Sequence, residues 1–238
     1  MIFTKQQIVS SNFIGADAKL SALGVFQLVE NAITEGMAAQ HIDGVTVKRL
    51  YNAFWVFTKN KVKILGEVAW GDTVNIESFV SQIYAAKLCV DTALKDTNGQ
   101  IVAYSRCEMC PLDIATGRIM RTSAVGVDER IIAEPALLDI AFDKLDCDNM
   151  PTVEDVTVRS TNIDFSQHTN NVEYLRFIFN TYSVSDLLAR PIREIDVNYV
   201  SQSYERDVLT VHKKSCEGFD LFAITKSAHP VIKCKIVR

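Results

Sequence analysis

The chain has 238 residues, of which 48% are hydrophobic and 23% charged, so it holds enough apolar material for one large domain or two small ones. Its formal net charge of −4 argues against a general nucleic-acid binder, which would carry an excess of basic residues. No apolar run is long enough to cross a bilayer, and the first residues lack the pattern of a signal peptide. We therefore expect a cytoplasmic protein without nucleic-acid or membrane partners.

The first half of the chain predicts one long helix followed by antiparallel strands. A short strand is expected over residues 7–13. Apolar residues then recur at helical spacing over residues 20–41, with Ser21 as the N-cap. Segments rich in β-branched and aromatic residues follow up to Val127, and turn signals such as Lys59-Asn60 and Asn98-Gly99 separate them. Residues 1–127 are therefore interpreted as one α+β domain.

The segment 128–155 has a different character, because it is rich in acidic residues and contains two prolines. We interpret it as an interdomain linker, with a short helix over residues 136–142. From residue 156 the earlier order returns: a strand over 156–165, a helix over 171–188 and then further strands. Residues 156–238 are interpreted as a second domain.

The order of strand, helix and strands thus occurs twice, which suggests an internal duplication. The repeat is visible in the spacing of four residues. In the first half these are Val62, Ile64, Glu67 and Asp72, and in the second half they are Val197, Tyr199, Gln202 and Asp207.

The cysteines and most histidines are interpreted as structural. Cys107 and Cys110 have the spacing of a metal or redox pair, but they lie in a strand-like segment, where that spacing points the side chains to opposite faces. The remaining cysteines are scattered, as expected for free thiols in a reducing compartment. His41, His212 and His229 have no companion at metal-binding spacing, so no metal site is predicted.

The segment NIDFSQHTNN, residues 162–171, gathers polar residues in front of the second predicted helix. If the chain is extended here, Asp164, Ser166 and His168 share one face, each about 6.5 Å from the next. A helix that begins near Asn170 or Asn171 would present free backbone N–H groups to a developing negative charge. Hydrolysis by acyl transfer needs these components. A turn followed by a capping residue explains the same residues without a function.

The segment DFSQHTNNVEY, residues 164–174, resembles the signature of HotDog-fold thioesterases, above all of the acyl-acyl-carrier-protein (acyl-ACP) thioesterases. In that family Asp-x-Asn-x-His-x-Asn-Asn-x-x-Tyr opens the second HotDog domain. The matching residues here are Asp164, His168, Asn170, Asn171 and Tyr174. The segments FWVFTKNKVKI and AWGDTVNIESFV are similar to strands of the family's first domain, so the resemblance covers essentially the whole chain.

The resemblance implies an α+β chain of two tandem HotDog domains, each a long central helix wrapped by a curved antiparallel sheet. It implies a thioester hydrolase of fatty acid biosynthesis that converts fatty acyl-ACP to free fatty acid and carrier protein. The partner would be acyl carrier protein, whose phosphopantetheine arm bears the acyl chain, and the protein itself would need no cofactor. As the carrier is acidic, its docking face is expected among the basic residues Arg159, Arg176, Arg190, Arg193, Lys213 and Lys214.

The resemblance also implies roles for single residues. Asp164 would orient or activate the catalytic groups, His168 would act as a catalytic or positioning residue, and the helix start at Asn170 and Asn171 would polarise the thioester carbonyl. A serine nucleophile assisted by the histidine is a second mechanism. It is less favoured, because alternate residues on one strand rarely form the short hydrogen bond that activation requires.

Two positions depart from the family pattern. The asparagine between aspartate and histidine is Ser166 here, and the acid of a later strand falls at Gln202, beside Ser203. An amide does not titrate in a useful range, so Gln202 cannot act as a general base. Either Asp164 then performs the base chemistry or activity is reduced.

Three readings therefore remain open. The first is an acyl-ACP thioesterase, the second is an acyl-CoA thioesterase of the same fold, and the third is an acyl-binding protein that no longer hydrolyses its ligand. Two fused HotDog domains already supply the pairing that single-domain relatives achieve by dimerising, so both a monomer and a homodimer are compatible with the sequence.

Overall fold

The computed structural model describes residues 2–128, 131 and 134–238. They form two compact units, Met1–Ala141 (unit 1) and Phe142–Arg238 (unit 2). The boundary between the units lies inside the segment 128–155. Residues 129, 130, 132 and 133 of that segment lie outside the described residues, and the linker and the exact domain limits stay predictions.

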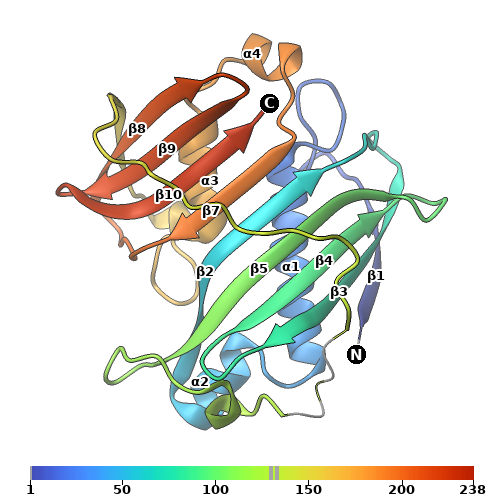
Figure 1. The fold of residues 1–238 in the computed structure, drawn as a ribbon, viewed down its shortest axis with the longest axis vertical. Coiled ribbons are helices and arrows are strands. Elements are labelled where there is room, and N and C mark those ends of the chain that lie inside the picture. Colours follow the sequence, from blue (N-terminus) through green and yellow to red (C-terminus); the bar gives the residue numbers. More distant parts are fainter. Residues whose placement is uncertain (1, 129–130, 132–133) are drawn as a thin grey trace. The chain divides into compact units, whose positions relative to one another are not determined.

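Unit 1 consists of an antiparallel sheet with a long helix against one face (Figure 1). Its helices are α1 (Ala22–Ala39) and α2 (Gly44–Tyr51). Its strands, in their order across the sheet, are β1 (Phe3–Ile8), β3 (Thr73–Ile83), β4 (Leu88–Lys95), β5 (Ile101–Asp113) and β2 (Ala53–Ile64). A 3₁₀ turn at Thr122–Val125 follows. The predicted α+β architecture is therefore observed in this unit.

The long helix forms where the apolar spacing predicts it. Ser21 is the N-cap, and its hydroxyl accepts a hydrogen bond from Gly24 N–H at 2.9 Å. The side chains that α1 buries include Val25, Phe26 and Ile33, which give the helix a broad apolar face toward the core. Packing of this face, rather than intrinsic propensity, supplies most of the stability of such a helix.

Three local predictions for unit 1 are wrong. The first strand is not at 7–13 but at Phe3–Ile8, because its register with β3 pairs Phe3 with Ser78 and Ile8 with Thr73. Lys59-Asn60 is not a turn, since β2 continues through it with a bulge and stays paired with β5. The short helix α2 was not foreseen, although Asp43 caps it by accepting hydrogen bonds from two backbone N–H groups.

The turn at Asn98-Gly99 is confirmed as a hairpin between β4 and β5. Gly99 has φ of 83°, a left-handed conformation that glycine adopts without a steric cost. Asp96 accepts hydrogen bonds from the backbone N–H groups of Asn98 and Gln100, which closes the loop.

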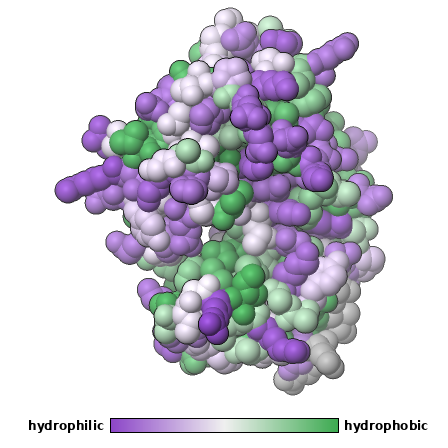
Figure 2. Space-filling model, turned by 60° about the vertical axis from the view of Figure 1, so that its left-hand side comes forward, coloured by the Kyte–Doolittle hydropathy of each residue, from purple (hydrophilic) through white to green (hydrophobic). Residues whose placement is uncertain are grey.

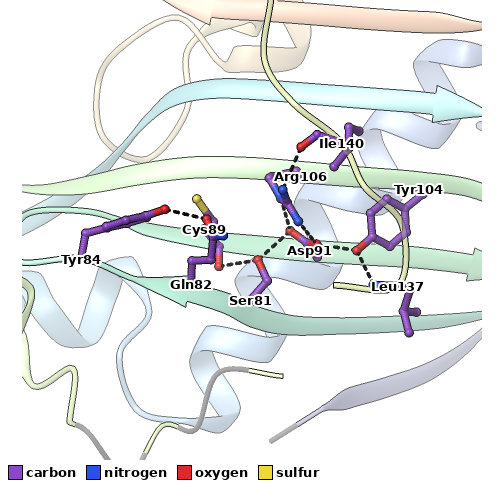
Figure 3. Close-up of polar contacts among 9 residues, drawn as sticks. All are labelled: Ser81, Gln82, Tyr84, Cys89, Asp91, Tyr104, Arg106, Leu137 and Ile140. Carbon is purple, nitrogen blue, oxygen red and sulfur yellow. Dashed lines mark hydrogen bonds and ion pairs between the residues drawn. The ribbon is translucent and has the colours of Figure 1, made fainter. Parts of the chain in front are cut away.

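A buried polar cluster lies on the sheet of unit 1 (Figure 3). Asp91 of β4 is fully buried, and Arg106 of β5 donates to its two carboxylate oxygens at 2.9 and 2.8 Å. Ser81 Oγ and the Tyr104 hydroxyl also donate to this carboxylate. Both carboxylate oxygens of Asp91 thus accept hydrogen bonds, as a carboxylate buried away from water requires.

The same cluster holds residues 136–142, which form no helix, contrary to the prediction. Leu137 N–H donates to the Tyr104 hydroxyl at 3.1 Å, and Arg106 donates to the Ile140 carbonyl at 2.8 Å. Ile140 is buried against Tyr104 and Ala93. Side chains satisfy these backbone groups and the apolar residues pack on the sheet, so the segment is held as irregular backbone without helical hydrogen bonds.

Unit 2 has the same kinds of element (Figure 1). Its strands, in their order across the sheet, are β7 (Glu194–Tyr199), β10 (His229–Val237), β9 (Phe219–Lys226), β8 (Val208–Cys216) and β6 (Thr152–Thr157). Its helices are α3 (Asn171–Phe179) and α4 (Val184–Ala189), and a 3₁₀ turn lies at Ser160–Asn162. Neighbouring strands pair antiparallel.

The helix predicted over 171–188 is divided into α3 and α4. Ser183 starts a new helix in a capping box, in which its hydroxyl and the carboxylate of Asp186 satisfy each other's backbone N–H groups. Tyr182, just before this cap, points its hydroxyl to Asp220 at 2.7 Å. The buried hydrogen bond of Tyr182 and the new N-cap at Ser183 therefore end α3 and start α4, although the apolar spacing favours one continuous helix.

The surface is mainly hydrophilic on the face shown in Figure 2, with hydrophobic side chains gathered in a few patches. Among the described residues, none of the helices has the length and apolar character needed to span a membrane.

The predicted duplication is confirmed by matching hydrogen bonds in the two units. In unit 1, Ala69 N–H donates to Asp72 Oδ2 at 3.0 Å, and in unit 2 Tyr204 N–H donates to Asp207 Oδ2 at 2.8 Å. These aspartates belong to the repeat recognised in the sequence, so its register also pairs Glu67 with Gln202.

A second match lies just before α1 in unit 1 and just before α3 in unit 2. Gly15 N–H donates to Lys19 O at 2.8 Å, and Asp164 N–H donates to His168 O at 3.0 Å. Each loop closes with an isolated bridge, Ile14 to Leu20 in unit 1 and Ile163 to Thr169 in unit 2. The counterpart of His168 in unit 1 is therefore Lys19.

Candidate active site

The polar residues 164–168 lie in a tight turn and not on an extended strand, so that prediction is wrong. Besides the bond from Asp164 N–H to His168 O, Gln167 N–H donates to Asp164 O at 3.1 Å. Gln167 has φ of 67°, in the left-handed region, which reverses the chain. The expected spacing of about 6.5 Å between alternate side chains therefore does not apply.

The turn brings Asp164, Ser166 and His168 into one hydrogen-bonded chain. Ser166 Oγ donates to Asp164 Oδ1 at 2.5 Å, and Ser166 N–H donates to the same oxygen at 2.8 Å. His168 Nδ1 lies 3.2 Å from Ser166 Oγ. All three side chains are partly buried. The three side chains approach one another closely because the backbone turns here, whereas on a strand they would stay apart.

The direction of these bonds fixes the tautomer of a neutral His168. Ser166 uses its only proton toward Asp164, so Nδ1 of the imidazole must be the donor to Ser166 Oγ. Nε2 then carries a lone pair and can accept a proton. Burial lowers the pKa of His168 below its usual value, although the negative charge of Asp164 acts in the opposite direction. The neutral imidazole is therefore the dominant form at neutral pH.

The helix start beside this turn is where the sequence predicts it. Asn170 is the N-cap of α3, and its side-chain oxygen accepts from Val172 N–H at 2.9 Å. The Asn170 N–H donates to Asn162 O at 2.8 Å, which ties the cap to the chain before the turn. Asn171 is the first helical residue, so its N–H belongs to a first turn whose N–H groups lack acceptors within the helix.

Three hydroxyl groups attach the segment with Gln202 to the motif. Ser203 is fully buried, and its Oγ lies 2.7 Å from Thr169 Oγ1 and 2.8 Å from the Tyr174 hydroxyl. Thr169 N–H also donates to Ser203 O at 2.9 Å. The backbone at Gln202, one residue before Ser203, is therefore held close to the motif by these hydrogen bonds. Thr169 was not singled out in the sequence, since a threonine in a loop gives no signal of its partners.

Tyr204 is the second residue that sequence reasoning missed. Its ring packs against the imidazole of His168, with centroids 5.1 Å apart and an angle of 56° between the planes. Lys226 Nζ lies 5.4 Å from the centroid of the Tyr204 ring. The contact joins residues far apart along the chain, so no local pattern could indicate it.

Other residues considered in the sequence lie elsewhere. All six cysteines are free, and Cys107 and Cys110 are buried in β5. Within the residues that the structure describes, no group of three or more His, Cys, Asp or Glu side chains could hold a metal ion.

Comparisons of the sequence with known proteins agree on one family. The model of the acyl-ACP thioesterase C-terminal domain matches residues 146–233, which include the turn, α3 and the segment around Ser203. Oleoyl-acyl carrier protein thioesterase 1, chloroplastic, of Arabidopsis thaliana is 20% identical over 224 residues, covering 87% of this chain and 62% of the relative. Dodecanoyl-[acyl-carrier-protein] hydrolase, chloroplastic, of Umbellularia californica is 22% identical, covering 92% and 62%. The chain spans about three fifths of the length of these curated relatives.

Solved structures share the fold over nearly the whole chain. An acyl-ACP thioesterase from Bacteroides thetaiotaomicron has a TM-score of 0.90 at 17% identity, covering 99% of this chain and 97% of that one. The 12:0-ACP thioesterase from Umbellularia californica has a TM-score of 0.89 at 18% identity, covering 99% and 96%. The tandem HotDog fold and the resemblance to the acyl-ACP thioesterases are thus confirmed.

Proposed function

We propose that this relative of the acyl-ACP thioesterases is itself a thioester hydrolase, which converts fatty acyl-ACP to free fatty acid and carrier protein. One observation carries the proposal: the hydrogen-bonded chain Asp164–Ser166–His168 lies two residues before the N-cap of α3, within the segment that matches the family's C-terminal domain. A base next to the N–H of Asn171 and the positive end of a helix is the arrangement that acyl transfer to water requires.

In the proposed reaction His168 is the general base and then the general acid. The oxygen of a water molecule attacks the thioester carbonyl carbon while its proton passes to Nε2 of His168. The carbonyl oxygen becomes an oxyanion, which the N–H of Asn171 and the positive end of α3 stabilise. Collapse of this intermediate breaks the C–S bond, and the leaving thiolate takes the proton from His168. Asp164, acting through Ser166, stabilises the transient imidazolium.

Gln202 is proposed to lie beside His168, and the internal repeat supports this placement. In unit 1 the counterparts are Glu67 and Lys19, and Lys19 Nζ forms an ion pair with Glu67 Oε2 at 2.5 Å. An amide at this position cannot take up a proton, but it can donate to or accept from the attacking water. Gln202 would then position water, and the base chemistry would rest on His168.

The pH profile tests the role of His168. The base is the neutral imidazole, so kcat/KM should be constant above its pKa and should fall as the pH drops through it. Because burial lowers that pKa, the fall should be centred below about 6.5, the ordinary value for histidine. Initial rates across the acid range, corrected for hydrolysis without enzyme, would show this. A fall centred clearly above the ordinary value would contradict the assignment.

The substrate class is tested by fatty acid release from matched acyl-ACP and acyl-CoA thioesters of increasing chain length. Faster hydrolysis of the carrier-bound esters supports the proposal and gives the chain-length preference. Faster hydrolysis of CoA esters would assign the chain to the acyl-CoA thioesterases. Folded protein that binds acyl chains but releases no fatty acid would identify a non-hydrolytic acyl-binding protein.

The remaining parts of the proposal concern partner, assembly and compartment. The carrier is proposed to dock on basic side chains of unit 2. Arg190, Arg193 and Lys214 are exposed. Arg176 is also exposed but pairs with Glu173, and Lys213 is half-buried with its Nζ 4.0 Å from the centroid of the Tyr182 ring. A monomer or a homodimer fits the fused fold. The cytoplasm remains the proposed compartment, in keeping with six free thiols, although the plant relatives are named as chloroplastic.

A further inference from the structure

Tyr204 lies at an exposed turn, yet its surroundings hold it in one place. Its N–H donates to Asp207 Oδ2 at 2.8 Å, and the same oxygen accepts from Lys226 Nζ at 2.7 Å. The ammonium group of Lys226 also faces the Tyr204 ring. On the other side, the neighbouring Ser203 is fixed in the buried hydroxyl cluster. Backbone and ring are thus restrained, although 47% of the residue is exposed.

The consequence for His168 is restraint from two sides. Nδ1 is held by Ser166 Oγ at 3.2 Å, and the ring contacts the ring of Tyr204. The hydrogen bond fixes one atom of the imidazole, and the packed aromatic ring restricts rotation of the imidazole about that bond and thereby the direction of Nε2. A general base needs such a fixed direction, because small displacements of a reacting group are costly.

The internal repeat shows that the fold does not require this tyrosine. In unit 1 the corresponding turn has Ala69, which makes the same bond to Asp72 that Tyr204 makes to Asp207. Unit 1 also lacks a histidine at the corresponding position, where Lys19 pairs with Glu67. The aromatic ring is present only in the unit that carries the candidate base.

We propose that Tyr204 is a positioning residue, which holds the imidazole of His168 in the orientation used for hydrolysis. The inference rests on the proposed function, because it assigns a partner to the proposed base. Tyr204 acts through its aromatic ring and not through its hydroxyl, so phenylalanine should serve equally well.

The test compares Tyr204→Ala with Tyr204→Phe. The alanine variant should fold, because the matching turn of unit 1 already has an alanine, Ala69, at this position. Its kcat should fall by about three- to tenfold with little change in KM, the effect of losing one ring pair. The phenylalanine variant should keep the parent rate. Tyr84→Ala is the matched control, since Tyr84 is 45% exposed, has Lys87 Nζ 5.1 Å from its ring centroid and donates its hydroxyl proton to Gln82 Oε1 at 2.8 Å.

A second readout does not depend on activity. NMR of the imidazole nitrogens, assigned with His168→Asn, reports the tautomer and the pKa of His168. Tyr204→Ala should admit water to the imidazole, so the pKa of His168 should rise toward the ordinary value for histidine. The fraction of neutral His168 that carries its proton on Nδ1 should also decrease. The charged groups nearby, Asp164 and the Lys226–Asp207 pair, remain in place. An unchanged imidazole spectrum in Tyr204→Ala would overturn the proposal. A changed spectrum in a protein without hydrolytic activity would overturn only the proposed function.

Discussion

Replacing His168 by alanine should lower kcat for acyl-ACP hydrolysis by about 10²- to 10⁴-fold, the usual contribution of a general acid–base group. Asp164→Asn should cause a loss of the same order, about 10²-fold or more, because the imidazolium would lose the negative charge that stabilises it through Ser166. The measurement is fatty acid release under saturating substrate, with circular dichroism to show that the variants remain folded. Full activity of His168→Ala would remove histidine from the mechanism.

Ser166→Ala separates the two mechanisms that the turn permits. If Ser166 only relays between Asp164 and His168, kcat should fall by about tenfold, since the histidine loses one restraint but keeps its lone pair. If Ser166 is the nucleophile, the loss should equal that of the histidine variant, and rapid quenching of the parent should trap an acyl ester on this serine. Ser185→Ala, an exposed serine of α4, is the control. We expect the smaller loss and no trapped ester.

Replacing Asp91 by alanine should lower the free energy of unfolding of unit 1 by about 3–5 kcal/mol, the range found when one partner of a buried ion pair is removed. Arg106 would keep its charge in a site that excludes water, and Tyr104 and Ser81 would lose their acceptor. Both tryptophans of the chain, Trp55 and Trp70, lie in unit 1, so fluorescence during urea unfolding reports on this unit.

The control is a solvent-exposed ion pair in the same unit. Glu67→Gln removes the partner of Lys19, and both side chains are largely exposed, so the change should stay within about 1 kcal/mol. The double variant Asp91→Leu, Arg106→Leu should recover part of the loss, because no charge is then left buried without a partner. A change of less than about 1 kcal/mol in Asp91→Ala would show that water enters the cluster when the carboxylate is removed.

The amino-acid sequence by itself determined the features that depend on local chemistry and periodicity. The long helix with Ser21 as its cap, the hairpin at Asn98-Gly99 and the start of α3 at Asn170 follow from spacing, capping and turn preferences. The duplication could be read from equal spacing, because both copies keep the residues that close the same turn. The motif in residues 164–174 was likewise sufficient to indicate the family.

Only the tertiary structure decided how the candidate site is assembled. The left-handed conformation at Gln167 turns a sequence that reads as a strand into a loop in which Asp164, Ser166 and His168 meet. The ring of Tyr204 reaches His168 from a segment more than thirty residues away in the chain. The bonds that hold residues 136–142 without a helix are formed with side chains of a strand that precedes them. Local preferences cannot encode such contacts, because their free energy comes from burial and hydrogen bonds formed only when distant segments pack together.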